Sequence, residues 1–538
     1  MEYYGLQVLG VITPFLAISA FMIPLLSLFI KRKSFYNVYA SVVSFIAMIF
    51  SFLVLADVYT SGKPIVYAYG GWPPPIGIAY EADAFNALIG AYTSFALFFV
   101  VLFSVWYSKV IDDVVWYYTL LLGLETGVLG CVYTGDVFNL FVMLEVLSIS
   151  AYALVAYYRN RPISIEAAAK YAMLGSVVTT CYFISLVFIY GSYGTLNMAD
   201  LAFKASRGVQ AVVVSNGLYG NIATASLIAL ALALWAFTFK SALFPNHFWL
   251  PDAYSGSPIP IAAAFSSAVE IVGVYMATRF LYTIFGVDSI VATTGFRDTI
   301  MTVLLILGML SGIVGALLMI TQDNVNRLLG YSTISHIGLL YMALALGLSG
   351  IPKDIVALGL VALLFHIINH GIGKLLMFMG VGVAVATTGT RDLNKLSGIG
   401  RVYPIASIAI IAAAFHLMGL IPFGGFFSKL LIYQAYISAE LLIPAIMVII
   451  ISAISVLGYI KIIYSIVFAP IEREYKRLNT MGIDILMILL IATCILLGIL
   501  SPWITSRLGI VVDNSLMPAG INKYLQSFFN TFYKLIPG

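Results

Sequence analysis

Charged residues are scarce in this sequence. Only 9% of its 538 residues are Asp, Glu, Lys or Arg, whereas 62% are hydrophobic and the mean hydropathy is +1.03. About a quarter of the residues of a soluble globular protein are charged, so the composition excludes a soluble multidomain protein. The net charge of +4 is spread over short segments and forms no basic face, which argues against a nucleic-acid partner. The sequence therefore predicts a polytopic membrane protein surrounded by the lipid bilayer.

The sequence also has little cysteine and none of the common nucleotide or redox motifs. Cys131, Cys181 and Cys494 lie far apart in apolar runs, so we interpret them as core residues and not as disulfides or metal ligands. There is no G-x-x-x-x-G-K-[ST], no C-x-x-C, and no G-x-G-x-x-G after a strand. We therefore expect no cofactor in this chain, so that any redox centres would belong to partner subunits. The energy for transport would come from an ion gradient or from a partner.

Long apolar runs dominate what is present. They are about 20 residues or longer, enough to cross a hydrocarbon core of roughly 30 Å, and too long and unalternating for barrel strands. They predict an all-α fold of about fourteen transmembrane helices. We place these helices at residues 6–30, 35–57, 85–108, 114–133, 136–158, 166–190, 222–250, 260–285, 299–320, 326–349, 354–386, 404–438, 440–468 and 483–505. Residues 195–203 are expected to form a short interfacial turn of helix, and residues 520–538 an amphipathic helix on the membrane surface.

Two blocks of five helices predict an internal repeat. Because each block has an odd number of crossings, the second copy would run upside down relative to the first. The fourth helix of each block carries a lysine near a proline, Lys240 with Pro245 and Lys429 with Pro422. We therefore divide the chain into a three-helix segment (1–113), a first repeat (114–285), a second, inverted repeat (299–468) and a last helix with an amphipathic tail (469–538).

Lysines and arginines in the predicted loops indicate the orientation. When the N-terminus is placed outside, the inner loops hold most of them, among them Lys31, Arg327, Arg473 and Lys476. We therefore expect a multi-pass protein of the plasma membrane with both termini outside the cytoplasm.

Charged residues also lie well inside the predicted spans. When Arg279 and Lys461, which are near helix ends, are set aside, these residues are Glu125, Glu145, Lys240, Glu270, Lys374 and Lys429. A charge at the centre of a spanning helix costs about 2.5–3.5 kcal/mol, so each is a candidate functional residue. Ion pairs that tie helices together are an alternative interpretation, but they explain poorly why two lysines lie beside prolines. Proline breaks a helix, and lipid tolerates such a break only where the freed backbone lines protein or water. Burial lowers the pKa of a lysine and a nearby carboxylate raises it, so a lysine subject to both effects can release and recover a proton. The pattern therefore indicates a polar path.

Histidines add a second pattern. His366, His370 and Lys374 recur every four residues and therefore line one face of a helix. Histidine titrates near neutrality and suits a proton relay, although the same residues could hydrogen-bond between helices. His-x-x-x-His supplies only two ligands and no third is apparent, so we expect no metal site. His336 and His416 are single intramembrane histidines, and each alone would more often be a packing residue.

Five ordered stretches carry a resemblance to a known family. They are TGDVFNLFVMLEVLSISAYALVA (134–156), KSALFPNHFWLPDAYSGSPIP (240–260), NRLLGYSTISHIGLL (326–340), LFHIINHGIGKLLMF (364–378) and GLIPFGGFFSKLL (419–431). They resemble the signature stretches of the antiporter-like proton-translocating subunits shared by respiratory complex I, Mrp-type cation/proton antiporters and energy-converting membrane-bound hydrogenases. The resemblance covers residues 83–470, and GGWPPPIGIAYEADAFNAL (70–88) is most similar to the Mrp D-type branch.

The resemblance implies a mechanism as well as a fold. The fold would have inverted repeats that each form a proton half-channel, broken helices seven and twelve, and a hydrophilic axis parallel to the membrane plane. A neighbouring subunit would perturb the pair of Glu145 and Lys240, and the proton of Lys240 would pass to the central lysine, Lys374, and to the terminal lysine, Lys429. The residues expected to transfer protons are Glu145, Lys240, His336, His366, His370, Lys374 and Lys429, with Glu270, Glu125, Lys170 and His416 as further candidates.

Two acids and the chain length depart from the family pattern. Many relatives carry a lysine or histidine on the eighth helix just before the G-V-Y that is Gly273–Tyr275 here, and this sequence has Glu270 nearby. Either the relay uses a carboxylate there or the acid pairs with a cation. Glu125 is unexpected within the fourth helix. No long segment follows the fourteenth helix, so we expect no lateral arm helix, which favours a D-type or central subunit.

The preferred interpretation is a proton-translocating subunit of a multisubunit complex that is driven by a redox module of the hydrogenase or complex I kind. The alternative is a D-type subunit of a non-redox Mrp sodium/proton antiporter, in which sodium would also be carried. A further alternative is a stand-alone secondary transporter for a small solute. Under the first two interpretations, the partners are other membrane subunits.

Overall fold

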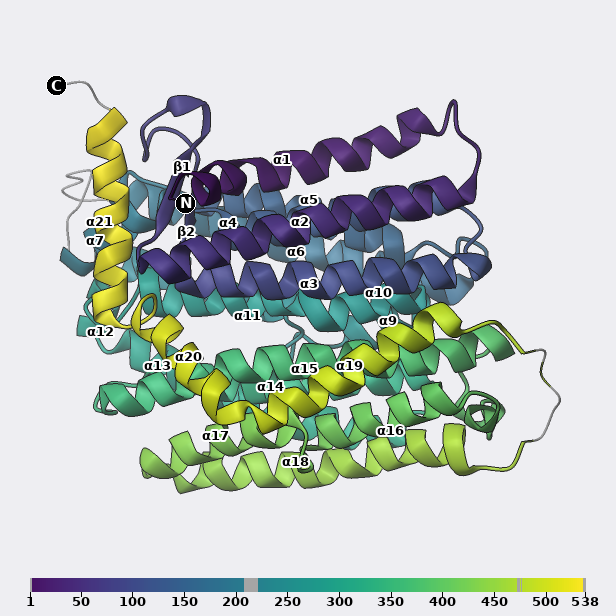
Figure 1. Ribbon diagram of the computed structural model, residues 1–538. Coiled ribbons are helices and arrows are strands. Elements are labelled where there is room, and N and C mark those ends of the chain that lie inside the picture. Colours follow the sequence, from purple (N-terminus) through teal and green to yellow (C-terminus); the bar gives the residue numbers. More distant parts are fainter. Residues whose placement is uncertain (1, 208–220, 472–474, 476, 536–538) are drawn as a thin grey trace.

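The computed structural model describes residues 2–207, 221–471, 475 and 477–535. Figure 1 shows long helices that run side by side in one bundle, with short connections at its two ends. The helices of the first part are α1 (Glu2–Leu26), α2 (Lys33–Ser61), α3 (Ala84–Tyr107), α4 (Val114–Tyr133), α5 (Val137–Val155), α6 (Pro162–Tyr193), α7 (Met198–Arg207), α8 (Ile222–Lys240), α9 (Trp249–Gly256), α10 (Ile259–Ala264), α11 (Glu270–Thr278) and α12 (Ile290–Thr293).

The second part continues the same arrangement. Its helices are α13 (Phe296–Thr321), α14 (Val325–Leu344), α15 (Lys353–Thr388), α16 (Pro404–Met418), α17 (Gly424–Ser438), α18 (Leu442–Ile463), α19 (Met481–Ile499), α20 (Ser501–Asp513) and α21 (Pro518–Leu535). Turns of π-helix extend α11 on both sides, at Phe265–Val269 and Arg279–Ile284, and follow α18 at Tyr464–Phe468. α10, α11 and these first two turns together form the predicted eighth helix.

Each predicted span contains helix. Among the described residues, twelve helices are long and apolar enough to cross a membrane, and α16 is a shorter apolar helix. α14 is outside that set because polar residues such as Asn326, Arg327 and Ser335 interrupt its apolar sequence. The chain is therefore an integral membrane protein, while the number of fourteen spans and the inverted repeats stay predictions.

Both predicted breaks are present. The seventh helix, expected at 222–250, ends at Lys240 and resumes at Trp249, and the twelfth is divided between Met418 and Gly424. The fourteenth helix differs from the expected range 483–505, because α19 ends at Ile499 and α20 begins separately at Ser501. Pro502 lies at the start of α20, where a proline without an N–H is tolerated.

A small sheet and two short helices cover one end of the bundle. β1 (Ile65–Ala68) pairs antiparallel with β2 (Ala79–Ala82), in a segment for which only a connection was predicted. α21, the predicted surface helix, lies across the ends of the long helices near β1 and α7, as Figure 1 shows. Tyr524 and Phe528 of α21 pack on Ala199 of α7. α7 corresponds to the predicted short helix, and the last three residues of the chain lie outside the described residues.

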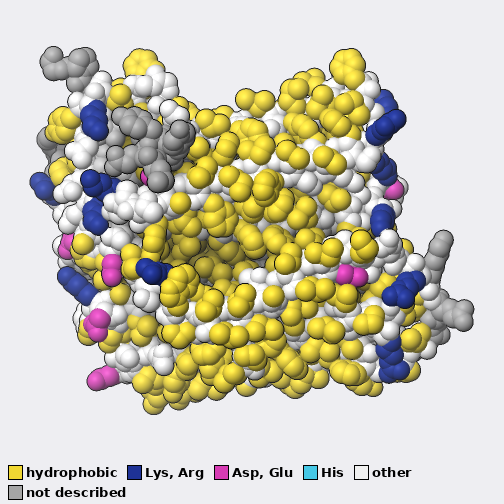
Figure 2. Space-filling model, in the orientation of Figure 1, with side chains coloured by type: hydrophobic (Ala, Val, Ile, Leu, Met, Phe, Trp, Pro, Cys, Tyr) yellow, Lys and Arg dark blue, Asp and Glu magenta, His cyan; other side chains and the backbone are white. Residues whose placement is uncertain are grey.

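The surface agrees with a position across a bilayer. Figure 2 shows a broad hydrophobic face, with Lys and Arg gathered at the two ends of the bundle. The first residues of α1 and the whole of α21 lie at the same end of the bundle (Figure 1). Arg473 and Lys476, which contributed to the predicted orientation, lie outside the described residues. The side of the membrane on which this end lies therefore stays a prediction.

Candidate functional site

Lys240 ends the first broken helix and is buried there. Its side chain is 2% exposed, and its Nζ donates to Ser148 Oγ of α5 at 2.5 Å and lies 3.5 Å from Tyr152 OH. The ammonium also lies 5.4 Å from the ring centroid of Tyr152 and 5.6 Å from that of Tyr171, within the range of cation–π attraction. Hydroxyls and aromatic faces, instead of a carboxylate, thus surround this lysine.

Glu145 lies on α5, one turn before Ser148, and is half-buried. Within the described part of the chain it forms no ion pair with Lys240 at 4 Å or less, although it is near enough to act on the lysine electrostatically. Instead it lines an open groove between α5 and α6 with Ser176, Thr179 and Thr180. Lys240 is therefore bonded to the helix that carries Glu145, but the two predicted partners are not in direct contact.

Tyr171 and Glu270 lie between Lys240 and the second half of the bundle. Tyr171 of α6 stacks on Trp249 with ring centroids 3.9 Å apart, and its buried hydroxyl has no partner among the described residues. Glu270 is fully buried, and its Oε1 accepts a hydrogen bond from Tyr254 at 3.2 Å. It also lies within electrostatic reach of Lys374. The geometry thus shows a carboxyl that is bonded to a tyrosine and lies near a lysine. Whether this acid takes part in the relay or pairs with a cation stays a prediction.

A continuous series of hydrogen bonds starts at Lys374. This lysine is fully buried in α15, and its Nζ donates to Leu329 O at 2.8 Å and to Ser332 Oγ at 2.7 Å. Ser332 of α14 is bonded to Tyr459 OH of α18 at 2.5 Å. The Tyr459 hydroxyl is in turn 3.1 Å from His336 Nε2. Three helices therefore contribute to one chain of polar atoms.

The same series continues through two histidines towards Lys429. His336 Nδ1 lies 3.1 Å from His366 Nε2, and His366 Nδ1 lies 3.0 Å from Ser428 Oγ. Ser428 immediately precedes Lys429 on α17. The relay chain, as we call Lys374, Ser332, Tyr459, His336, His366 and Ser428, is thus unbroken from the central lysine to the neighbour of the terminal one.

Lys429 is bound at the end of a half-helix. Its Nζ donates to Leu417 O at 2.8 Å and to Met418 O at 3.1 Å, the last carbonyls of α16. Such carbonyls lack intrahelical partners, and the negative end of the helix dipole favours a cation. The second helix break therefore creates the site that holds this lysine.

Three other predicted residues lie outside the relay chain. His370 is buried with its ring 4.9 Å from that of His336, and neither of its nitrogens has a partner among the described residues. His416 Nε2 lies 2.9 Å from Asn369 O and fixes α16 to α15. Lys170 is about half exposed and forms ion pairs with Glu166 at 2.6 Å and Asp252 at 3.3 Å.

Glu125 is also apart from the relay chain. It is fully buried in α4, where Ser44 of α2 donates to its Oε1 at 3.0 Å. Among the described residues, no hydrogen bond or ion pair joins it to another predicted site residue.

Sequence reasoning missed the hydroxyl groups of the relay chain. Ser332, Ser428 and Tyr459 connect residues that were predicted, but single hydroxyls in apolar helices give no distinctive pattern. The one available signal was the position of two serines within the family-like stretches at 326–340 and 419–431.

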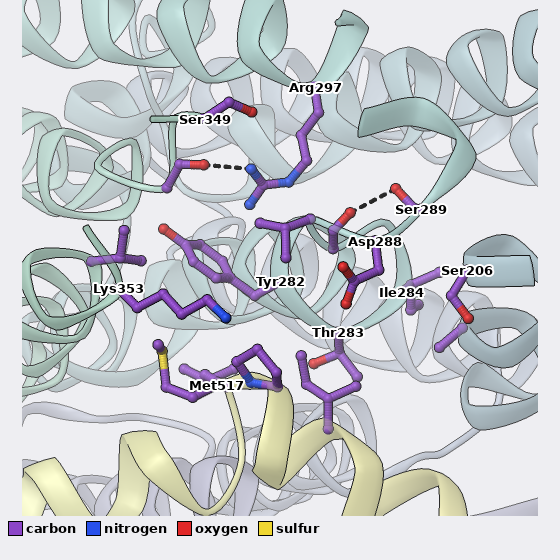
Figure 3. A pocket seen from close by; sticks show the side chains of 18 of the residues that line it. Ser206, Tyr282, Thr283, Ile284, Asp288, Ser289, Arg297, Ser349, Lys353 and Met517 are labelled. Atoms are coloured by element: carbon purple, nitrogen blue, oxygen red, sulfur yellow. Dashed lines mark hydrogen bonds between the residues drawn. The ribbon is translucent and has the colours of Figure 1, made fainter. Parts of the chain in front are cut away.

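Another cavity lies at the end of the bundle near α20 and α21. Figure 3 shows Tyr282, Arg297 and Lys353 on its wall, together with Met517 of the segment between α20 and α21. No residue predicted for proton transfer lines it, so we do not include it in the site.

An ion-paired cluster closes the same end. Arg279 and Asp83 are buried and form two hydrogen bonds, at 2.6 and 3.0 Å. Burial and the Asp83 carboxylate raise the pKa of the adjacent Glu81 well above its ordinary value. The cluster lies between β2, the eighth helix and Tyr524 of α21, and so helps to anchor that helix.

Comparison with known proteins gives consistent matches. Residues 134–457 match the family described as "NADH:quinone oxidoreductase/Mrp antiporter, TM". The chain is 30% identical over 443 residues to the D subunit of the Na(+)/H(+) antiporter of Alkalihalophilus pseudofirmus, covering 82% of this chain and 83% of the relative. It is 32% identical over 385 residues to the N subunit of the NADH-quinone oxidoreductase of Desulforudis audaxviator, covering 70% of each.

A solved structure shares the whole fold. A chain of the membrane-bound sulfane sulfur reductase, an archaeal respiratory membrane complex, aligns with a TM-score of 0.84 at 29% identity. The alignment covers 97% of this chain and 100% of that one. The arrangement of helices that positions the relay chain is therefore one that a respiratory membrane complex also uses.

Proposed function

We propose that this chain, which belongs to the NADH:quinone oxidoreductase/Mrp antiporter transmembrane family, moves protons as a subunit of a larger membrane complex. The chain is an antiporter-like membrane subunit by its family, and our proposal concerns the path that protons take through it. The observation that carries the proposal is the unbroken relay chain from Lys374 to Ser428.

The chemistry of the relay chain suits proton transfer. Serine and tyrosine hydroxyls each donate and accept, and a neutral histidine donates from one ring nitrogen and accepts at the other. A proton released by Lys374 can therefore enter at Ser332 while each following group passes its own proton to the next. His366 gives a proton to Ser428, and Ser428 releases its own hydroxyl proton towards the adjacent Lys429. The hydroxyls and rings then turn back to their starting donor directions.

Glu145 has the position of a switch in this scheme. It acts on Lys240 from the groove between α5 and α6, while the lysine itself is bound by Ser148. A neighbouring subunit that changes the position or protonation of Glu145 changes the electrostatic stabilisation of the Lys240 ammonium. Lys240 then gains or releases its proton, and Tyr171 and Glu270 lie between it and Lys374.

The driving module is proposed to lie in other chains. A redox module is our first candidate, because the fold extends over the whole of a chain from a respiratory membrane complex. A non-redox Mrp sodium/proton antiporter is the second, because the relative with 30% identity is the D subunit of a Na(+)/H(+) antiporter. In either case we propose that this chain holds no cofactor. We also propose that the complex lies in the plasma membrane and that both termini of this chain lie outside the cytoplasm.

Ion flux measured with the intact complex in sealed vesicles tests the proposal. Proton uptake into the vesicles should require the complex. Uptake that depends on an added electron donor would support the redox module, and uptake that depends on sodium would support the Mrp antiporter. Co-purifying subunits with nickel–iron or iron–sulfur centres would support the redox module. Proton-independent uptake of a solute by this chain alone would contradict both.

A further inference from the structure

A second set of polar side chains, buried or partly buried, lies in the first helices of the chain. It joins α2 to α4, which Figure 1 shows in the upper part of the bundle, whereas α14, α15 and α18 lie in the lower part. On α2, Asn37, Ser44 and Ser51 recur every seven residues, or roughly 10 Å along the helix. These three side chains therefore line one face of α2 at three depths.

Each of these residues has a polar neighbour on α4. At the first depth, Tyr118 donates to Asn37 Oδ1 at 2.9 Å. At the second, Ser44 donates to Glu125 at 3.0 Å. At the third, Ser51 lies within electrostatic reach of the Tyr133 hydroxyl, and neither group has a hydrogen-bond partner among the described residues. The two helices thus share a column of polar groups in the direction of the membrane normal.

Glu125 is the acidic group at the middle of this column. It is fully buried, and its Oε2 has no partner in the described ranges. The elements packed on α4 include α1, α2, α3, α5, α11 and β2. Their described charged side chains are Lys33, Asp57, Glu81, Glu145 and Glu270. Lys33, the single cation of that set, is eleven residues before Ser44 on α2, or about 16 Å away along the helix.

A carboxyl in this position requires a proton or another cation. An isolated carboxylate is costly in a low-dielectric interior, and no cation within the described residues compensates it. A metal cation takes several oxygen ligands, whereas among the described residues Ser44 is the one hydroxyl bonded to this carboxyl. A proton needs only one of the two carboxyl oxygens, so the site fits a proton.

We infer that Glu125 is a proton-binding site at the midpoint of a second polar column, between α2 and α4, which is separate from the relay chain. The carboxylate takes up one proton to become the acid and returns the same proton on release. The groups at the other two depths supply donors and acceptors that buried water can bridge. This site adds to the proposed function and does not depend on the order of steps in the relay chain.

Infrared difference spectroscopy of the intact complex in membranes tests this inference. A change of pH should produce a carboxylic C=O band from Glu125 that is lost in Glu125→Gln, which has nearly the same shape. Ser44→Ala keeps the carboxyl and removes its hydrogen bond, so the band should remain with a shifted frequency. Deuterium in the solvent should shift the wild-type band as well, since the proton exchanges through the column.

The Lys374→Ala variant separates this result from the proposed function. It should lose proton flux and keep the Glu125 band. A band that is unchanged in both Glu125→Gln and Ser44→Ala, or that does not respond to pH and deuterium, would overturn the inference and leave Glu125 as a structural bond between helices. If Glu125→Gln fails to assemble, the presence or absence of the frequency shift in Ser44→Ala decides the question.

Discussion

The two broken helices of this protein place a lysine at the break in different ways. In the first, Lys240 lies before Pro245, at the last residue of α8, and hydroxyl and aromatic groups surround it. In the second, Lys429 lies after Pro422, on the second half-helix, and it caps the carbonyls of the first. The same proline-containing break thus supports two different electrostatic environments.

The connections of the two lysines differ as well. Beyond Lys240, the buried Tyr171 hydroxyl has no partner among the described residues, so the path towards Glu270 is interrupted. In the relay chain between Lys374 and Ser428, by contrast, neighbouring polar atoms lie 2.5–3.1 Å apart at every step. The difference is the one that our proposal requires, in which the first half acts as a switch that must move and the second as a path whose hydrogen bonds are already formed.

Lys240→Ala is expected to have the largest effect. Without the ammonium, the first half has no proton to release, so ion-linked transport by the intact complex should fall to the background of empty vesicles. The complex should still assemble, because Ser148 keeps its bond to Leu144 O and Tyr152 keeps its ring contact with Tyr171. Flux and subunit composition should be measured on the same preparation. Transport at the wild-type rate would show that the first half is not the switch.

Glu145→Gln should come next. The amide keeps the shape of the side chain and removes its charge, so it cannot change the proton affinity of Lys240. We expect transport to fall by at least about tenfold, which corresponds to about 1.4 kcal/mol. Thr180→Ala, in the same groove, is the matched control and should retain transport. Equal losses in the two variants would mean that the groove matters only for assembly.

Tyr459→Phe tests the formed path in the second half. It removes the hydroxyl that links Ser332 to His336 and keeps the ring. Because this change interrupts the relay chain, we expect proton flux to fall by about tenfold, which corresponds to about 1.4 kcal/mol in activation free energy. Tyr464→Phe, on the exposed side of the turn that follows α18, serves as the control. Wild-type flux in Tyr459→Phe would remove this residue from the path.

Lys170→Ala should have the smallest effect. Its ion pairs with Glu166 and Asp252 are exposed to solvent, where such pairs contribute little. Proton flux should be within error of wild type, measured at low and at physiological salt. A loss comparable to that of Tyr459→Phe would place Lys170 on the path after all.

The sequence allowed a good prediction of where the charged groups lie. The spacing of His366, His370 and Lys374 and the prolines after Lys240 and before Lys429 indicated a relay face and two helix breaks, because helical periodicity and proline geometry are local properties. It did not reveal Tyr459, because the contact between α14 and α18 depends on how distant helices pack. It also did not reveal that Glu145 and Lys240 form no direct ion pair among the described residues, because that depends on side-chain conformation, which local sequence does not determine.

The most direct test of the proposed path compares Lys374→Ala with His416→Ala in sealed vesicles that contain the intact complex. Lys374 donates into the relay chain, whereas His416 bonds to a backbone carbonyl outside it. We predict that proton flux is lost in Lys374→Ala and largely retained in His416→Ala. Retained flux in Lys374→Ala, with a greater loss in His416→Ala, would contradict the path.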